Sequence, residues 1–151
     1  MNTIDWKVVA FDDMSARELH DCLALRAAVF VVEQNCPYQD PEEKDLKSWH
    51  ILGYADDALV ATARIVAPGV SYPEVSIGRL ATATSHRGTG AGRELMRVCL
   101  DTIVDRYGDV PIRISAQSYL QRFYESFRFQ RTTKPEYLED DIPHVEMLRT
   151  S

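Results

Sequence analysis

The sequence predicts an α/β fold with a mixed central sheet flanked by helices. Three observations support this prediction: strand-like and helix-like segments alternate, hairpin and crossover connections both occur, and a glycine-rich loop joins a strand-like segment to a helix-like one. The chain has 151 residues, which is enough for one ordinary domain and too few for two. Residues 1–151 are therefore expected to form a single domain.

Local signals place the expected elements. Ser15 opens the first helix because Glu18 stands three residues later, as in a capping box. Asp56 and Asp57 separate two strand-like runs and predict a hairpin turn. We expect strands at residues 6–11, 50–55, 58–66, 75–82, 112–115, 129–133 and 145–148, helices at 15–30, 95–107 and 119–127, and a loop at 35–48.

The composition excludes several classes of protein. The net charge is −6, which disfavours a nucleic-acid binder. Apolar runs such as 29–32 are too short to span a bilayer, and residues 1–6 do not resemble a signal peptide. Three cysteines without a CxxC motif suit a reducing cytoplasm. The four histidines lack metal-ligand spacing, so we expect a cytoplasmic protein with no metal, nucleic-acid or membrane partner.

The glycine-rich loop is the main candidate for chemistry. It follows a predicted strand, opens a predicted helix, and consists of Arg87, Gly88, Thr89, Gly90, Ala91 and Gly92. Glycines allow positive φ and leave backbone amides accessible, and a helix N-terminus favours anions. The loop is therefore predicted to bind a pyrophosphate, with an ordinary structural helix start as the alternative.

Other nucleotide-binding patterns fail at this loop. No Lys-Ser or Lys-Thr follows Gly92, as a P-loop requires. Arg93 or Leu95 stands where the third glycine of a dinucleotide fingerprint belongs. Residues 69–73 lack the second glycine of a nucleophile elbow. A phosphate-binding domain of another fold is therefore disfavoured.

The pattern Arg87-x-x-Gly90-x-Gly92 resembles motif A of the GNAT acetyltransferases. Residues 123–129 resemble the late F-Y-x-x-x-G-F element of that family, with Arg128 in place of the usual glycine. Four further segments are similar to ElaA-type members, so the resemblance extends over nearly the whole chain: residues 26–40, 49–53, 115–117 and 137–144.

The resemblance implies a GNAT fold with a splayed strand pair that binds acetyl-CoA as cosubstrate. Backbone groups of Leu80, Ala81 and Thr82 would then hold the pantetheine arm and the acetyl carbonyl. Amides of residues 87–92 would bind the pyrophosphate, and Arg87 would add a charge-assisted contact.

Tyr124 is the predicted general acid, because the tyrosine of this element protonates the departing thiolate in GNAT enzymes; a packing tyrosine is the alternative. The base is less defined. By the expected register, Ser76 stands where some GNAT enzymes have a catalytic glutamate. Glu33 is the best carboxylate in the ElaA-like segments, and His50 and His144 are further candidates on the acceptor side. A chain of water molecules is another alternative for this step.

The resemblance implies transfer of acetyl from acetyl-CoA to a primary amine of a small molecule or peptide, by direct attack in a ternary complex. Direct transfer needs no nucleophile, so Cys36 is expected to be incidental. Acidic residues within 40–45 and 136–141 are predicted to favour a cationic acceptor. A non-catalytic acyl-CoA-binding or regulatory module is the alternative function, and a homodimer is left open.

Overall fold

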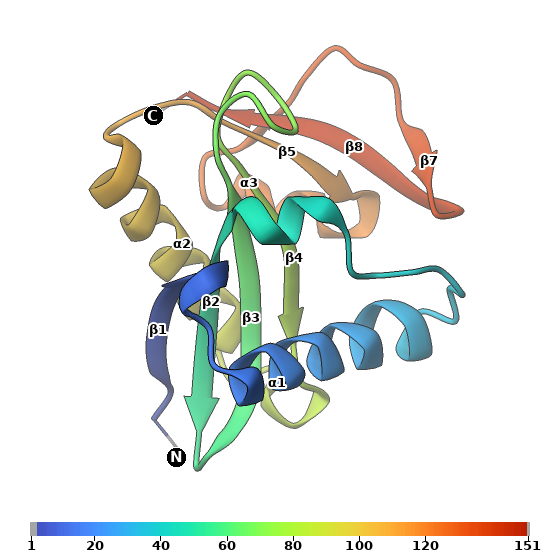
Figure 1. The fold of residues 1–151 in the computed structure, drawn as a ribbon. Helices are drawn as coiled ribbons and strands as arrows, with labels where there is room; N and C mark the ends of the chain where they lie inside the picture. The colour runs from blue at the N-terminus through green and yellow to red at the C-terminus, as the bar shows by residue number, and fades with distance from the viewer. Residues whose placement is uncertain (1–2, 151) are drawn as a thin grey trace.

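A computed structural model describes residues 3–150 (Figure 1). Its strands are β1 Asp5–Ala10, β2 Ser48–Ala55, β3 Ala58–Val66, β4 Ser76–Thr82, β5 Ile112–Gln117, β6 Gln130–Arg131, β7 Tyr137–Glu139 and β8 Ile142–Arg149. Its α-helices are α1 Ala16–Arg26, α2 Ala91–Tyr107 and α3 Gln121–Glu125. The order of the elements confirms the predicted α/β fold.

The strands form two antiparallel sheets that meet at one point. The first has the order β1-β2-β3-β4, and the second has the order β5-β8-β6 with β7 also on β8. Among the described residues, β4 and β5 are joined by one parallel bridge between Val75 and Ile112, where Arg113 N–H donates to Val75 O at 3.1 Å. Beyond this bridge the strands diverge, so the edges of β4 and β5 that face each other form a wedge.

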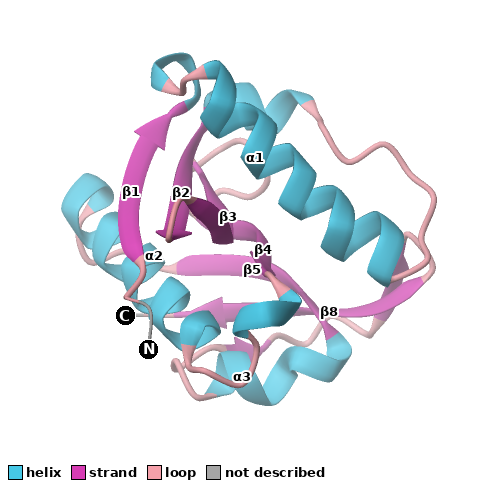
Figure 2. Ribbon diagram, turned by 90° about the horizontal axis from the view of Figure 1, so that it is seen from below, coloured by secondary structure: helices cyan, strands magenta, loops and turns pink. Residues whose placement is uncertain are grey.

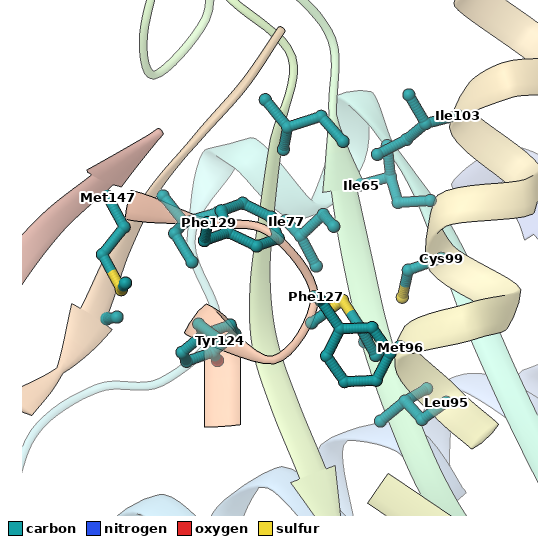
Figure 3. Packing of buried hydrophobic residues seen from close by; sticks show 14 of the residues in the cluster. Ile65, Ile77, Leu95, Met96, Cys99, Ile103, Tyr124, Phe127, Phe129 and Met147 are labelled. Carbon is teal, nitrogen blue, oxygen red and sulfur yellow. The ribbon is translucent and has the colours of Figure 1, made fainter. Parts of the chain in front are cut away.

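Helices cover both faces of the strands. Figure 2 shows α1 on one side and α2 with α3 on the other. The main core lies between the sheets and α2, and Figure 3 shows Phe127 beside Met96 of α2, with Phe129 near Met147. Since burial of apolar surface stabilises each element, this core fixes α2 and α3 against the divergent strands and thereby positions the wedge.

Local signals explain most element ends. Ser15 and Glu18 form the predicted capping box of α1. Asp56 and Asp57 have φ values of 50° and 67°, as the turn of a tight hairpin requires. Gly53 lies beneath the ring of Trp6: a Cβ there would stand 2.6 Å from the ring. That glycine lets the tryptophan lie flat across β2.

Three segments differ from the expectation. The first helix does not continue regularly to residue 30, because Ala27–Glu33 forms a π-helical turn after α1. The expected helix at 119–127 divides into a 3-10 turn, Ser118–Leu120, and the short α3. Strand β7 was not expected. It pairs with β8 through a hairpin whose turn residues, Asp140 and Asp141, have φ values of 51° and 62°.

Candidate active site

A cavity of about 910 Å³ occupies the wedge between the two sheets. Its walls include Gly78 and Leu80 on β4, Ser115 and Gln117 on β5, and Tyr124 on α3. On the β4 side, strand pairing with β3 leaves the other edge free to hydrogen bond a ligand. An extended chain such as a pantetheine arm could therefore add to β4 as a strand would.

A β-bulge shapes the β4 wall. Arg64 pairs with Gly78 and Thr62 pairs with Ala81, so Arg79 and Leu80 both lie opposite Ala63. Arg79 has a φ of 51°, which costs energy for a residue with a Cβ. Gly78, Arg79 and Leu80 all line the cavity, and nothing in the local sequence predicted the bulge.

Ion pairs hold the bulge in place. The Arg79 guanidinium donates to Asp40 Oδ1 and Glu42 Oε2, each at 2.8 Å. Its plane also lies over the rings of Phe30 and Tyr38, with centroid distances of 5.9 and 5.7 Å. Arg79 is therefore bound to Asp40 and Glu42 and not to the glycine-rich loop, although it precedes that loop by only a few residues in the sequence.

The same carboxylates bind two more arginines in the interior. Arg26 donates to Asp40 at 2.8 Å and to Asp45 at 2.9 Å, and Arg64 donates to Asp45 at 2.9 Å. Arg64 also reaches Glu42 Oε2 at 3.0 Å. The expectation that residues 40–45 attract a cationic acceptor is therefore wrong for these carboxylates, because arginines neutralise them.

The glycine-rich loop has the geometry of an anion site. Gly88 and Gly90 have φ values of 75° and 89°, which glycine adopts readily. Gly90 is the N-cap of α2, and Glu94 N–H donates to Gly90 O at 3.0 Å. The amides that precede Glu94 at this helix end lack partners within the helix, so they are available to phosphate oxygens. Gly88 and Gly92 line the cavity.

Arg87 and Glu33 connect this loop to the π-helical turn. Two guanidinium nitrogens of Arg87 donate to the two carboxylate oxygens of Glu33, and the same guanidinium donates to Thr82 O. Hydrogen bonding by Arg87 lowers the pKa of Glu33. The adjacent Gln34 exchanges amide hydrogen bonds with Gln117 at 3.1 and 3.3 Å. Residues 33 and 34 thus tie the β4 side of the wedge to the β5 side.

Tyr124 lies at the wall of the cavity. It is 7% exposed, and its ring packs edge-on against Phe123 and Phe129. Burial raises the pKa of the Tyr124 phenol above its usual range. The hydroxyl therefore stays protonated near neutral pH, which a general acid requires.

The two candidate histidines have different surroundings. His50 is 2% exposed and its Nε2 lies 2.8 Å from Asp45 O. Burial lowers the pKa of His50, and the residue is not part of the cavity wall. His144 lines the cavity instead, with Nδ1 2.7 Å from Ile142 O and Nε2 3.5 Å from Glu139 Oε2. The structure thus brings His144, and not His50, to the cavity.

Sequence reasoning missed Tyr72, which lines the cavity and whose pKa burial raises to about 12. Ser115 and Glu139, which lie in the ElaA-like segments, line the cavity as well. Cys36 also lines it, but its thiol donates to Asp140 O at 3.2 Å. This bond joins the loop after the π-helical turn to the β7–β8 hairpin. The Asp140-Asp141 turn was the one local signal in the sequence that could have predicted the β7–β8 hairpin, which brings Glu139 and His144 to the cavity.

The remaining predicted loop and strand residues have mixed positions. Leu80, Thr82 and Arg87 line the cavity, whereas Ala81 and Ala91 are each 2% exposed. Their side chains face the core, so a ligand could reach only their backbone groups. No cluster of three or more His, Cys, Asp or Glu residues that could hold a metal occurs within residues 3–150. No helix in the same range is long and apolar enough to cross a membrane.

An opened strand edge beside an anion-binding loop and a buried phenol is the architecture of an acyltransferase. The family model described as "Acetyltransferase (GNAT) domain" matches residues 17–151, and the chain therefore belongs to the GNAT acetyltransferases. Within this family it is similar to Protein ElaA of Escherichia coli, with 43% identity over 97% of this chain and 96% of that protein. The ElaA-type resemblance is thus confirmed.

Solved structures agree with this assignment. An acyl-CoA N-acyltransferase from Pseudomonas aeruginosa has a TM-score of 0.92 at 38% identity, covering 98% of this chain and all 100% of that chain. Escherichia coli ElaA has a TM-score of 0.90 at 42% identity, covering 97% and 99%. The protein is therefore an acetyltransferase enzyme whose fold suits an acyl-CoA and an acceptor.

Proposed function

We propose that the protein transfers the acetyl group of acetyl-CoA to a primary amine of a small molecule or peptide, by direct attack in a ternary complex. The position of Tyr124 carries this proposal: a buried, protonated phenol lines the same cavity as the open β4 edge. In this arrangement the backbone of Leu80, Ala81 and Thr82 holds the pantetheine arm and the thioester, and the amides of residues 87–92 hold the pyrophosphate.

Tyr124 supplies the proton that the leaving thiolate needs. Glu33 and His144 both line the cavity and are the candidates to take a proton from the acceptor. Arg87 occupies both carboxylate oxygens of Glu33 and lowers its pKa, which weakens Glu33 as a base. The free thiols of the three cysteines support a reducing, cytoplasmic location.

The test is an assay of thiol release from acetyl-CoA over small amines, polyamines, amino acids and peptides. Tyr124→Phe should lower kcat by about 10²- to 10⁴-fold with acetyl-CoA binding retained. Tyr107→Phe, on the far end of α2, is the matched control and should leave kcat unchanged. Full activity of Tyr124→Phe would exclude its acid role. Binding of CoA without turnover of any acceptor would favour the non-catalytic module.

A further inference from the structure

A polar cluster closes the end of the cavity that faces the β7–β8 hairpin. Ser115 Oγ donates to Glu139 Oε1 at 3.2 Å and also hydrogen bonds the Tyr137 hydroxyl. Glu139 Oε2 lies 3.5 Å from His144 Nε2, and the His144 ring stacks on Tyr137 with a centroid distance of 6.1 Å. One carboxylate thus faces both a hydroxyl and an imidazole.

The hydrogen bonds of His144 define the role of each ring nitrogen. Ile142 O is a pure acceptor and lies 2.7 Å from Nδ1, so Nδ1 carries a proton. In the neutral ring, Nε2 then carries the lone pair, and His144 lines the cavity. A proton gained at Nε2 would have the Glu139 carboxylate 3.5 Å away, and that opposite charge would stabilise the imidazolium.

We propose that His144 is the base that takes the proton of the acceptor ammonium, and that Glu139 is the positioning residue that stabilises the resulting imidazolium. This inference rests on the proposed acetyl transfer. The ammonium gives one proton to His144 Nε2, and its nitrogen attacks the thioester carbonyl. The C–N bond forms and the C–S bond breaks. The thiolate takes the Tyr124 proton, the new amide nitrogen returns its second proton to Tyr124, and His144 releases its proton to solvent.

The charges around His144 indicate which acceptors fit. Asp140 also lines the cavity, and Lys134 is turned to the Tyr137 ring, with its Nζ 4.3 Å from the centroid. Tyr72 and Tyr137 have raised pKa values because they are buried, so both are neutral near neutral pH. Glu139 and Asp140 thus give this end of the cavity negative charge, in contrast to Asp40, Glu42 and Asp45, which are paired with arginines. The acceptor class is a cationic amine.

Kinetics can separate the two roles. The variants are His144→Gln and Glu139→Gln, with Asp101→Asn as the control, because Asp101 is an exposed carboxylate on α2 that does not line the cavity. His144→Gln should lower kcat by about 10²-fold and remove the acidic limb of the kcat profile. Glu139→Gln should lower kcat about tenfold with KM for acetyl-CoA unchanged, and Glu139→Asp should recover part of that loss. Asp101→Asn should change neither constant.

A second measurement does not depend on turnover. In NMR spectra of the histidine ring nitrogens, with His144→Gln for assignment, His144 should show the tautomer protonated at Nδ1, as its bond to Ile142 O requires. A neutral ring protonated at Nε2 would overturn the base role, and a rise in KM of Glu139→Gln with kcat unchanged would overturn the positioning role. If the wild type turned over no amine at all, both the proposed acetyl transfer and this inference would fail. Normal kcat in His144→Gln would overturn only the base assignment.

Discussion

The carboxylate of Glu33 forms a two-pronged ion pair with the guanidinium of Arg87 at the mouth of the wedge. Arg87 belongs to the loop that is proposed to hold the pyrophosphate, whereas Glu33 ends the π-helical turn. The pair therefore competes with any phosphate for the same guanidinium. Because the two side chains are 41% and 39% exposed, the pair contributes at most about 1 kcal/mol to stability.

This competition predicts the effect of Glu33→Gln. Arg87 loses its anionic partner and is free to meet a phosphate, so we expect KM for acetyl-CoA to fall about two- to fivefold, with kcat changed less than about tenfold. Steady-state kinetics with acetyl-CoA as the varied substrate measure both. Glu43→Gln, on an exposed 3-10 turn, is the control. A loss of kcat beyond about 10²-fold would instead identify Glu33 as the base.

Removal of Arg26 tests the buried ion-pair network. The guanidinium is 1% exposed and binds both Asp40 and Asp45. Arg26→Leu leaves two buried carboxylates short of a partner, and we expect a loss of about 3–5 kcal/mol in the free energy of unfolding. Arg17→Leu, whose side chain is 82% exposed in its pair with Asp21, should cost less than about 0.5 kcal/mol. Urea denaturation compares them; equal losses would contradict the structural role of Arg26.

Asp45 should make the fold sensitive to acid. Burial alone would raise its pKa, but hydrogen bonds from Arg26, the Glu42 amide and Arg64 lower it to about 2. A carboxyl whose folded pKa lies below its unfolded value stabilises the fold above pH 4 and loses that contribution as the pH falls from about 4 to 2. Asp45→Asn should flatten the stability profile over this window, as measured by urea midpoints at each pH. An unchanged slope would refute the assignment.

Two glycines in strands predict opposite outcomes. Gly53→Ala would place a Cβ 2.6 Å from the Trp6 ring, so the ring must shift, and we expect a loss of about 1–3 kcal/mol. The shift would also strain the 2.7 Å hydrogen bond from Trp6 Nε1 to Glu94. Gly78→Ala meets its nearest atom at 3.9 Å and should leave the melting temperature within a few degrees of wild type. Equal melting temperatures for the two variants would show that Trp6 adapts freely.

Features encoded by neighbouring residues were predictable from the sequence. The capping box at Ser15, the hairpin at Asp56-Asp57 and the loop before α2 each depend on a few adjacent residues. The same Asp-Asp signal at 140–141 marks the β7–β8 hairpin, but β7 has only three residues and shows no clear alternation. A strand this short is fixed by its partner rather than by its own pattern.

Features that depend on distant partners were not predictable. Arg79 and Arg87 look alike in the sequence, yet one pairs with residues 40–42 and the other with Glu33. His50 and His144 likewise differ only in the surroundings that the fold gives them. Sheet register and the path of the 35–48 segment decide these contacts, and both arise from packing over long separations in sequence.

Among the described residues, one bridge between Val75 and Ile112 pairs the β4 and β5 sides of the wedge. A bound substrate can therefore hydrogen bond backbone groups that the facing strand leaves unpaired. Amides on an unpaired strand edge exchange with deuterium quickly, and a ligand that bonds them slows that exchange. Saturating acetyl-CoA should therefore protect residues 78–82 far more than the paired strands β2 and β3. On the proposed function, acetyl-CoA would act as a transient strand, and each round of catalysis would include the making and breaking of part of a sheet.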